Sequence, residues 1–257
     1  MSDPGVRLDR DGPVAAVTLC RPHVLNAQTP AMWMALRQFG RDLPGDIRVV
    51  VVRGEGRAFS AGLDLAAVSA TPDNSDDFSF PNMAAKDDSE AAETIARFQE
   101  GFSWLRRADL VSIAAVRGHA IGAGFQLALA CDLRVLAEDA QLTMAEVSLG
   151  LVPDLGGTKR LVELVGYARA LEICVTGRRV GASEADRLGL ATSVVPADDL
   201  DKAVEELTAQ ILTARRDAVV EIKALLAAAA SRGFPEQEAA ERSAQVRRIR
   251  DLVGQGE

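Results

Sequence analysis

The sequence predicts a mixed α/β fold, and two observations support that prediction. Short β-branched runs alternate with helix-like segments through the first half of the chain, whereas the last third is mainly helical in its spacing. The chain also has 257 residues, of which 48% are hydrophobic and 26% charged, so it can bury a large core. Strands that alternate with helices in this way are expected to be buried on both faces.

Four strands are predicted in the first half from runs of β-branched and small apolar residues. They cover residues 14–20, 47–54, 111–118 and 132–138. Helical spacing predicts a helix at about 30–41 and another over 91–107. No strand is followed by GxGxxG or GxxxxGK[ST], so the nucleotide-binding Rossmann and P-loop classes have no motif support.

Residues 66–90 interrupt this alternation, because Pro, Asn, Ser and Asp dominate them. The segment is predicted to be a loop, with Phe78, Phe80 and Met83 scattered through it. Two interpretations stay open: a plain surface insertion, or a cover whose few apolar residues close over a ligand.

The last third carries two amphipathic helices. The apolar face of the first consists of Leu200, Val204, Leu207 and Ile211, and that of the second of Val219, Ile222, Leu225 and Leu226. Such faces are typical of packing surfaces, within a chain or between subunits.

Composition excludes several classes of protein. The three cysteines, Cys20, Cys131 and Cys174, lie far apart without CxxC spacing, which argues against disulfides and zinc. Only two histidines are present, His23 and His119, so a histidine-rich metal site is not expected. A net charge of −8 argues against nucleic acid and anionic membranes as partners. The polar N-terminus has no signal-like apolar stretch, and no run of 18 apolar residues follows, so a cytoplasmic location is expected.

Two glycine-containing turns follow strands and lead into helices. In HAIGAGFQLALACDLR (119–134), amides near Gly122 and Ala123 would point at a ligand over the helix N-terminus. In RGEGRAFSAGLDL (53–65), small residues allow a second close approach of backbone to ligand. Either turn could be purely structural. Together they predict an oxyanion hole, and therefore acyl or enolate chemistry.

Two carboxylates follow the second of these turns in the chain. Glu146 is flanked by apolar residues and Asp154 precedes a Gly-Gly-Thr helix start. Apolar surroundings raise the pKa of a carboxyl group and suit it to proton exchange near neutral pH. The structural alternatives are an ion pair at a helix edge for Glu146 and an N-cap for Asp154.

Four segments in this order resemble the crotonase superfamily, the enoyl-CoA hydratase/isomerase family: RPHVLNA (21–27), RAFSAGLDL (57–65), HAIGAGFQLALACDLR (119–134) and AEVSLGLVPDLGGTKRL (145–161). The resemblance implies a spiral of repeated β-β-α units over residues 1–195 and a C-terminal helical trimerisation segment over 196–257. It also implies a homotrimer or a dimer of trimers. Coenzyme A would enter as part of an acyl-CoA thioester substrate, and no separate cofactor or metal is implied.

The resemblance also implies site residues. Matching the motifs assigns the oxyanion amides to Ala61 and Ala123. The CoA moiety would lie along Val24 and the loop from Arg57 to Asp64, and the substrate-contacting positions are Val24, Arg57, Ala58, Gly62, Leu63, Asp64 and Gly122. Charge alone adds Lys223, Arg247, Arg248 and Arg250 as candidates for the CoA phosphates.

One departure from the family pattern bears on the reaction. Family hydratases use glutamates at the positions of Gln126 and Glu146, and here the first is an amide that cannot exchange protons. A single base suffices to move a double bond. Glu146, with Asp154 as a second acid/base and Gln126 beside them, therefore favours an enoyl-CoA or dienoyl-CoA isomerase. The alternatives are a hydratase or another acyl-CoA lyase or hydrolase, and an acyl-CoA binding protein without catalysis.

Overall fold

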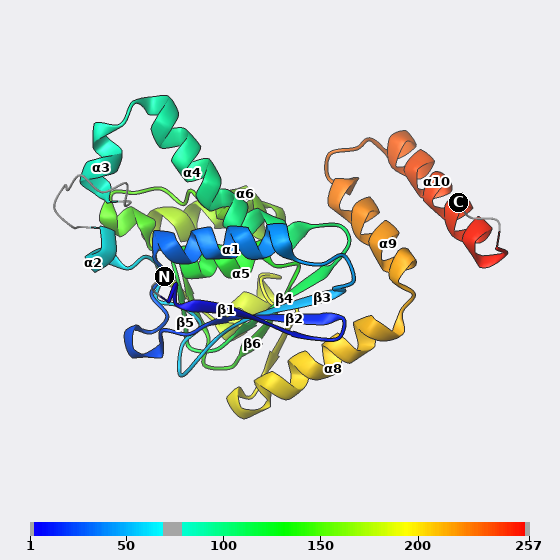
Figure 1. Ribbon diagram of the computed structural model, residues 1–257, viewed down its shortest axis with the longest axis horizontal. Helices are drawn as coiled ribbons and strands as arrows, with labels where there is room; N and C mark the ends of the chain where they lie inside the picture. The colour runs from blue at the N-terminus through cyan, green and yellow to red at the C-terminus, as the bar shows by residue number, and fades with distance from the viewer. Residues whose placement is uncertain (1–2, 69–78, 255–257) are drawn as a thin grey trace.

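The computed structural model describes residues 3–68 and 79–254. A six-stranded sheet forms its centre, with the strand order β1-β2-β3-β4-β6-β9 (Figure 1). Its strands are β1 (Val6–Asp11), β2 (Val14–Leu19), β3 (Val49–Gly54), β4 (Val111–Val116), β6 (Leu133–Ala137) and β9 (Ser193–Val195). Only the β1–β2 hairpin is antiparallel, and the other neighbours in this sheet are parallel.

A smaller sheet has the order β5-β7-β8, formed by β5 (His119–Ile121), β7 (Gln141–Thr143) and β8 (Arg179–Gly181). Successive strands alternate between the two sheets: β4 lies in the large sheet and β5 in the small one, and β6 and β7 repeat that step. A helix follows each pair, α5 (Ala123–Ala130) after β5 and α6 (Gly157–Thr176) after β7. This repeated β-β-α unit is the one that the resemblance to the crotonase superfamily implies.

The remaining helices cover the sheets or extend from them. They are α1 (Pro30–Asp42), α2 (Leu65–Val68), α3 (Phe80–Ala85), α4 (Asp88–Ser103), α7 (Ala182–Arg187), α8 (Leu200–Thr213), α9 (Arg216–Ala229) and α10 (Phe234–Leu252). Single 3-10 turns are η1 (Pro22–Val24), η2 (Trp104–Arg106), η3 (Glu146–Leu149) and η4 (Ala197–Asp199).

Both faces of the large sheet are buried, as its strand sequences require. Alternate residues of a strand point to opposite faces. In β3, Val50 and Val52 join the main core, whereas Val49 and Val51 join a second cluster that Leu200 of α8 completes. Each valine removed from water in this way contributes about 1.5–3 kcal/mol to folding. A continuous run of valines therefore suits a strand covered on both sides.

The four predicted strands and the helix at 30–41 are confirmed to within two residues. The predicted loop over 66–90 is wrong in part, because α3 and the start of α4 lie within it. Both helices begin at side-chain caps: the Ser79 hydroxyl accepts from the Asn82 amide at 3.2 Å, and the Asp87 carboxylate accepts from the Glu90 amide at 2.9 Å. Residues 69–78, including Phe78, lie outside the described residues.

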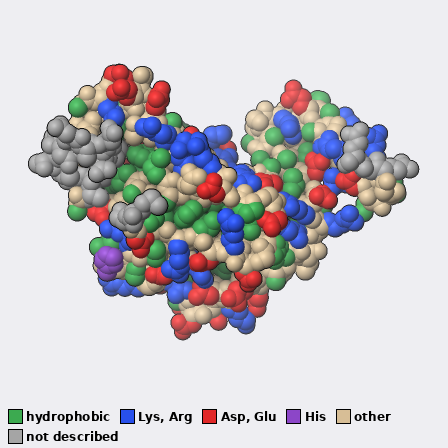
Figure 2. Space-filling model, in the orientation of Figure 1, with side chains coloured by type: hydrophobic (Ala, Val, Ile, Leu, Met, Phe, Trp, Pro, Cys, Tyr) green, Lys and Arg blue, Asp and Glu red, His purple; other side chains and the backbone are tan. Residues whose placement is uncertain are grey.

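Only helices follow β9 in the described part of the chain. Helix α8 packs on the large sheet, and α9 and α10 form an arm that projects from the body in Figure 1. Apolar side chains are exposed on this arm (Figure 2). Ile222 of α9 is 55% exposed and Leu226 is 70% exposed. The Lys223 ammonium anchors the arm, donating to the Leu110 carbonyl at 2.7 Å and to the Asp132 carboxylate at 2.6 Å.

Candidate active site

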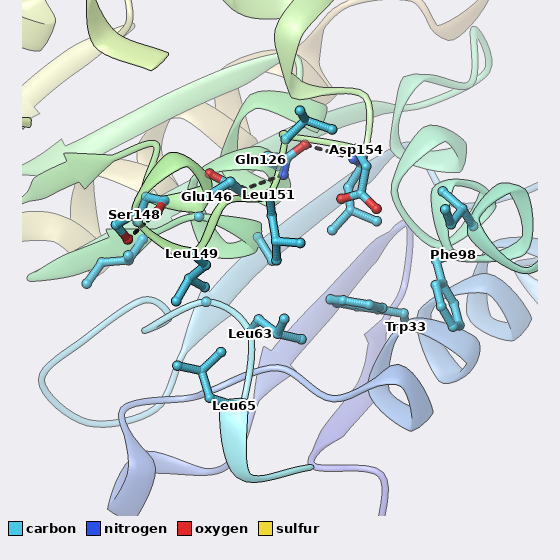
Figure 3. A pocket seen from close by; sticks show the side chains of 18 of the residues that line it. Trp33, Leu63, Leu65, Phe98, Gln126, Glu146, Ser148, Leu149, Leu151 and Asp154 are labelled. Atoms are coloured by element: carbon cyan, nitrogen blue, oxygen red, sulfur yellow. Dashed lines mark hydrogen bonds between the residues drawn. The ribbon is translucent and has the colours of Figure 1, made fainter. Parts of the chain in front are cut away.

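A cavity of about 480 Å³ opens between the small sheet, α5 and helices α1, α3 and α4 (Figure 3). The polar side chains that line it are Gln126, Glu146, Ser148 and Asp154. Its apolar lining comes from Trp33, Leu63, Leu65, Phe80, Met83, Ile95, Phe98, Ile121, Leu149, Leu151, Val152 and Leu155. The cavity therefore combines a hydrocarbon wall with a small group of carboxylates and one amide.

Gln126 is fixed at both ends of its side chain. Its oxygen accepts hydrogen bonds from the amides of Leu155 at 2.9 Å and Gly157 at 3.2 Å, and its Nε2 donates to Glu146 Oε1 at 2.7 Å (Figure 3). The side chain is 1% exposed. Gln126 thus accepts two backbone amides that have no partner within α6, those of Leu155 just before the helix and of Gly157 at its first position. It orients Glu146 at the same time.

Glu146 presents one oxygen to Gln126 and leaves the other unsatisfied. Oε2 is buried and has no hydrogen-bond partner among the described residues. Burial raises the pKa of the Glu146 carboxyl group. Its own backbone amide and the Gln126 hydrogen bond oppose this rise in the pKa, and the charge of Asp154 adds to it. The ion pair considered for Glu146 is not formed in the described structure. A carboxylate with one fixed and one free oxygen can take up and return a proton.

Asp154 lines the same cavity from the turn before α6, and Figure 3 shows Gln126 between it and Glu146. Burial raises the pKa of its carboxyl group as well. The N-cap of α6 is Gly156 rather than Asp154, and Gln126 accepts the amide of Gly157, the first residue of the helix. The structure therefore brings Gln126, Glu146 and Asp154 together as predicted, with Asp154 free of the capping role.

The two glycine turns meet beside these carboxylates. Gly62 has φ +84°, and a Cβ there would lie 2.4 Å from the Ile121 carbonyl oxygen and 3.6 Å from the Ala123 amide nitrogen. Gly122 has φ +50°, and a Cβ there would lie 3.3 Å from Glu146 Oε1. Only glycine combines these backbone angles with such close approach.

The structure corrects one of the two oxyanion assignments. The Ala61 amide donates to the Leu25 carbonyl oxygen at 2.8 Å, so it is not available to a ligand. Leu63, two residues on, forms a parallel bridge with Gln28. In this bridge the Gln28 amide donates to the Gly62 carbonyl oxygen, and the Asp64 amide donates to the Gln28 carbonyl oxygen. The Leu63 amide therefore points to the opposite side, away from Gln28. Neither the Leu63 nor the Ala123 amide has an acceptor within the described ranges, and both residues line the cavity.

Four of the residues expected to contact CoA, outside the two glycine turns' amides, fall into three groups. Val24 is 38% exposed at the end of η1, and Arg57 is exposed with no ion pair to any described residue. Ala58 is 1% exposed and its carbonyl accepts from Asn26 Nδ2 at 2.8 Å, so its side chain belongs to the core instead. Asp64 pairs with Arg21 at 2.9 Å and accepts from the Ala66 amide at 3.2 Å, which holds the turn after Leu63.

Most of the basic residues proposed for the CoA phosphates are already engaged. Lys223 is bound to Asp132, Arg247 pairs with Glu221 at 2.7 Å, and Arg248 pairs with Asp217 and Asp251. Arg250 is exposed and makes no ion pair with the residues described. These ion pairs count against the charge-based assignment for Lys223, Arg247 and Arg248. The sequence alone does not show which basic residues have carboxylate partners within the chain.

An aromatic pair forms one wall of the cavity. The rings of Trp33 and Phe98 have centroids 5.1 Å apart, and Figure 3 shows them at the end of the cavity beyond Asp154. Phe80 and Met83 of α3 line another part, which favours the covering interpretation of this segment over a plain insertion. Sequence reasoning placed Trp33 and Phe98 on helices, but nothing in helical spacing distinguishes a cavity wall from a packed core.

Among the described residues, no group of three or more His, Cys, Asp and Glu side chains is arranged to hold a metal ion. Within the same part of the chain, every helix is too short or too polar to cross a membrane.

Comparison with known proteins identifies the class of enzyme to which this fold and site belong. Residues 9–252 match the family model described as enoyl-CoA hydratase/isomerase, so the chain belongs to that family of enzymes within the crotonase superfamily. The carnitinyl-CoA dehydratase of Salmonella typhi is 36% identical over 222 residues, covering 85% of this chain and 78% of its own.

Solved structures give the same assignment. A Thermobifida fusca YX protein designated an enoyl-CoA hydratase, in complex with CoA, has a TM-score of 0.92 and 48% identity, covering 98% of this chain and 95% of its own. The same protein in complex with acetoacetyl-CoA is 49% identical, with 96% of each chain covered and a TM-score of 0.92. An enoyl-CoA hydratase of Mycobacterium smegmatis is 30% identical, with a TM-score of 0.82 and coverage of 95% and 90%.

Proposed function

We propose that this protein is an enoyl-CoA isomerase that moves a double bond in a 3-enoyl-CoA or dienoyl-CoA thioester. The observation that carries the proposal is the arrangement of Gln126 and Glu146. Gln126 uses its oxygen for the α6 amides and its nitrogen for Glu146, so Glu146 acts alone at this end of the cavity. Bond migration needs one base, whereas the hydration route of the family uses a glutamate at both positions.

The thioester carbonyl is proposed to accept hydrogen bonds from the amides of Leu63 and Ala123. These two donors stabilise the oxyanion that forms when the α-carbon loses a proton. Removal of one donor of this kind costs roughly 3–4 kcal/mol of transition-state stabilisation in a well-studied protease. The second donor is proposed to be the Leu63 amide rather than the Ala61 amide, because the Ala61 amide donates to the Leu25 carbonyl oxygen.

Glu146 is proposed to carry the proton through its free Oε2. It takes the α-proton of a 3-enoyl-CoA, and the C–H electron pair forms a dienolate whose negative charge lies on the thioester oxygen. Return of the proton to the γ-carbon draws electrons from the C3–C4 double bond, which leaves the new double bond between C2 and C3. Atoms and charge are conserved, and no cofactor is required. Asp154 is the second acid/base group for substrates with a further double bond.

CoA is proposed to lie along Val24, with Arg57 near its phosphates, because the Arg57 guanidinium is exposed and not paired with a described carboxylate. The Thermobifida relative binds CoA and acetoacetyl-CoA, which supports a CoA thioester as the ligand of this chain. We also propose that the arm of α9 and α10 mediates trimer formation, since its apolar side chains are exposed in the single chain.

The direct test mixes purified protein with trans-3-hexenoyl-CoA and follows the rise in ultraviolet absorbance as the double bond becomes conjugated with the thioester. A parallel sample of crotonyl-CoA reports hydration as a fall in the same absorbance. We expect conversion in the first assay to exceed that in the second.

Hydration is the second candidate, because the relatives reported above are named hydratases or dehydratases. Glu146 and Asp154 could then divide the acid and base roles. Crotonyl-CoA hydration that disappears in Asp154→Asn would favour it over isomerisation.

A further inference from the structure

A buried chain of polar side chains links the aromatic wall of the cavity to both glycine turns. Trp33 Nε1 donates to Gln28 Oε1 at 2.8 Å, and Gln28 Nε2 donates to Ser60 Oγ at 3.1 Å. Ser60 Oγ in turn donates to the Asn26 carbonyl at 2.8 Å and accepts from the Gly62 amide at 3.1 Å. Gln28 and Ser60 are both 0% exposed, so each bond in this chain is shielded from water.

The backbone of Gln28 holds the Leu63 turn directly. The Gln28 amide donates to the Gly62 carbonyl at 2.6 Å, and the Gln28 carbonyl accepts from the Asp64 amide at 2.8 Å. These two bonds fix the peptide groups on either side of Leu63. The direction of the Leu63 amide therefore depends on where Gln28 sits.

Ser60 connects the same chain to the Ala123 turn. Its amide donates to the His119 carbonyl at 2.8 Å, and its carbonyl accepts from the Ile121 amide at 3.0 Å. A Cβ on Gly124 would lie 2.8 Å from the Ser60 carbonyl oxygen, so the two segments are in contact at this point. A displacement of Ser60 would therefore move the strand that leads into Ala123.

We infer that Gln28 is a positioning residue that sets the geometry of the two amide donors, Leu63 and Ala123, and connects them to the Trp33 wall. This inference rests on the proposed placement of the thioester oxygen between those amides. Gln28 touches no reacting atom in this arrangement. It acts by holding Ser60 and the Leu63 turn in one position relative to the end of the acyl cavity.

The test compares two thioesters of similar size, acetoacetyl-CoA and butyryl-CoA. Acetoacetyl-CoA loses a proton from the carbon between its two carbonyls, and the resulting enolate oxygen is the group that the two amides would stabilise. Butyryl-CoA cannot ionise in this way at neutral pH. The ratio of their dissociation constants, together with the ultraviolet absorbance of the bound enolate, therefore reports the donors and cancels general changes in the cavity.

The variants are Gln28→Met, which keeps a similar volume without polar atoms, and Trp33→Phe, which keeps an aromatic wall but removes the Nε1 donor. Gln38→Met is the matched control, since Gln38 is exposed on α1 and bonds only Asp42 in the described structure. Removal of a whole oxyanion donor lowers catalysis by about 10²–10³-fold, so a misaligned pair is expected to lose about tenfold in the binding ratio.

We expect wild type and Gln38→Met to prefer acetoacetyl-CoA and to show the enolate absorbance. Gln28→Met and Trp33→Phe should show a binding ratio about tenfold lower and a weaker enolate absorbance, while still binding butyryl-CoA. A wild-type preference that persists unchanged in folded Gln28→Met or Trp33→Phe would overturn the inference and leave the proposed function standing. Absence of the preference in wild type would overturn the proposed oxyanion pair, and the inference with it. If Gln28→Met does not fold, the binding ratio of Trp33→Phe, which is the smaller perturbation, tests the inference alone.

Discussion

Replacement of Glu146 by glutamine should abolish most of the isomerase activity without disturbing the site. The new amide can turn its oxygen toward Gln126 Nε2, which at present donates to Glu146 Oε1 at 2.7 Å. The hydrogen bonds from Gln126 to the Leu155 and Gly157 amides are unaffected. Glu146→Gln therefore removes the proton carrier and preserves its surroundings.

The expected loss follows from the role assigned to the carboxylate. A positioned general acid/base contributes about 10²–10⁴-fold to rate, and in this site Glu146 both removes the proton and returns it. The loss in kcat should lie in or above that range. KM should change little, because the thioester contacts proposed for the amides of Leu63 and Ala123 remain.

The same variant carries a pH signature in stability. The pKa of Glu146 is raised in the folded protein, chiefly by burial, so folding favours its protonated form. The contribution of the protonated Glu146 carboxyl group to the free energy of unfolding is fully present below the unfolded-state pKa, near 4.5. It is lost as the pH rises through the folded-state pKa. Glutamine does not titrate. The free energy of unfolding of Glu146→Gln should therefore increase relative to that of wild type as the pH rises through this window.

The assay is the absorbance change with trans-3-hexenoyl-CoA, and denaturant unfolding at several pH values accompanies it. Glu205→Gln is the matched control, because Glu205 is exposed on α8, away from the cavity. Its kcat and stability profile should follow wild type. Full activity in Glu146→Gln would refute the proton-carrier role outright.

Three further predictions concern other parts of the site. Gln126→Glu should keep the hydrogen bonds at the start of α6 but place a second carboxyl group against Glu146, so the two groups must share a proton. Crotonyl-CoA hydration should then rise at least tenfold in the absorbance assay. An unchanged hydration rate would contradict the role given to Gln126. Asp154→Asn should lower turnover of a 3,5-dienoyl-CoA by about 10²-fold and that of a 3-monoenoyl-CoA by less than tenfold, measured in parallel. Arg57→Ala should raise KM for acyl-CoA about three- to tenfold, less at high salt, and leave the KM of a phosphate-free pantetheine thioester unchanged; equal effects on both thioesters would exclude a phosphate contact.

Local patterns were sufficient to predict the central strands. In β3 a run of valines is bounded by a glycine, and such a run has few alternatives to a strand buried on both faces. The three-residue strands β5, β7, β8 and β9 were not predicted, because segments of that length carry no periodicity. Their existence depends on pairing between distant parts of the chain.

Cap chemistry explains the error over residues 66–90. Composition favoured a loop, but Ser79 and Asp87 each stand directly before a helix and accept an amide at its start. Residues typical of loops are also the residues that begin helices. Polar composition alone therefore did not separate the two structures.

The candidate site was predictable as a set of residues but not as a set of contacts. Gln126, Glu146 and Asp154 line one cavity as expected. The availability of the Ala61 amide could not be predicted, because it depends on the Leu25 carbonyl, 36 residues earlier in the chain. The intrachain partner of Lys223 is likewise 91 residues away. Hydrogen bonds between distant segments decide which donors a ligand can reach.

Proton NMR of the products formed from trans-3-hexenoyl-CoA in D₂O tests the proposed one-base mechanism most directly. The proposed mechanism predicts 2-hexenoyl-CoA as the main product, with part of the original α-hydrogen transferred to the γ-carbon, because one buried oxygen, Glu146 Oε2, both takes and returns the proton. Accumulation of 3-hydroxyhexanoyl-CoA as the main product, or the absence of any bond migration, would contradict it.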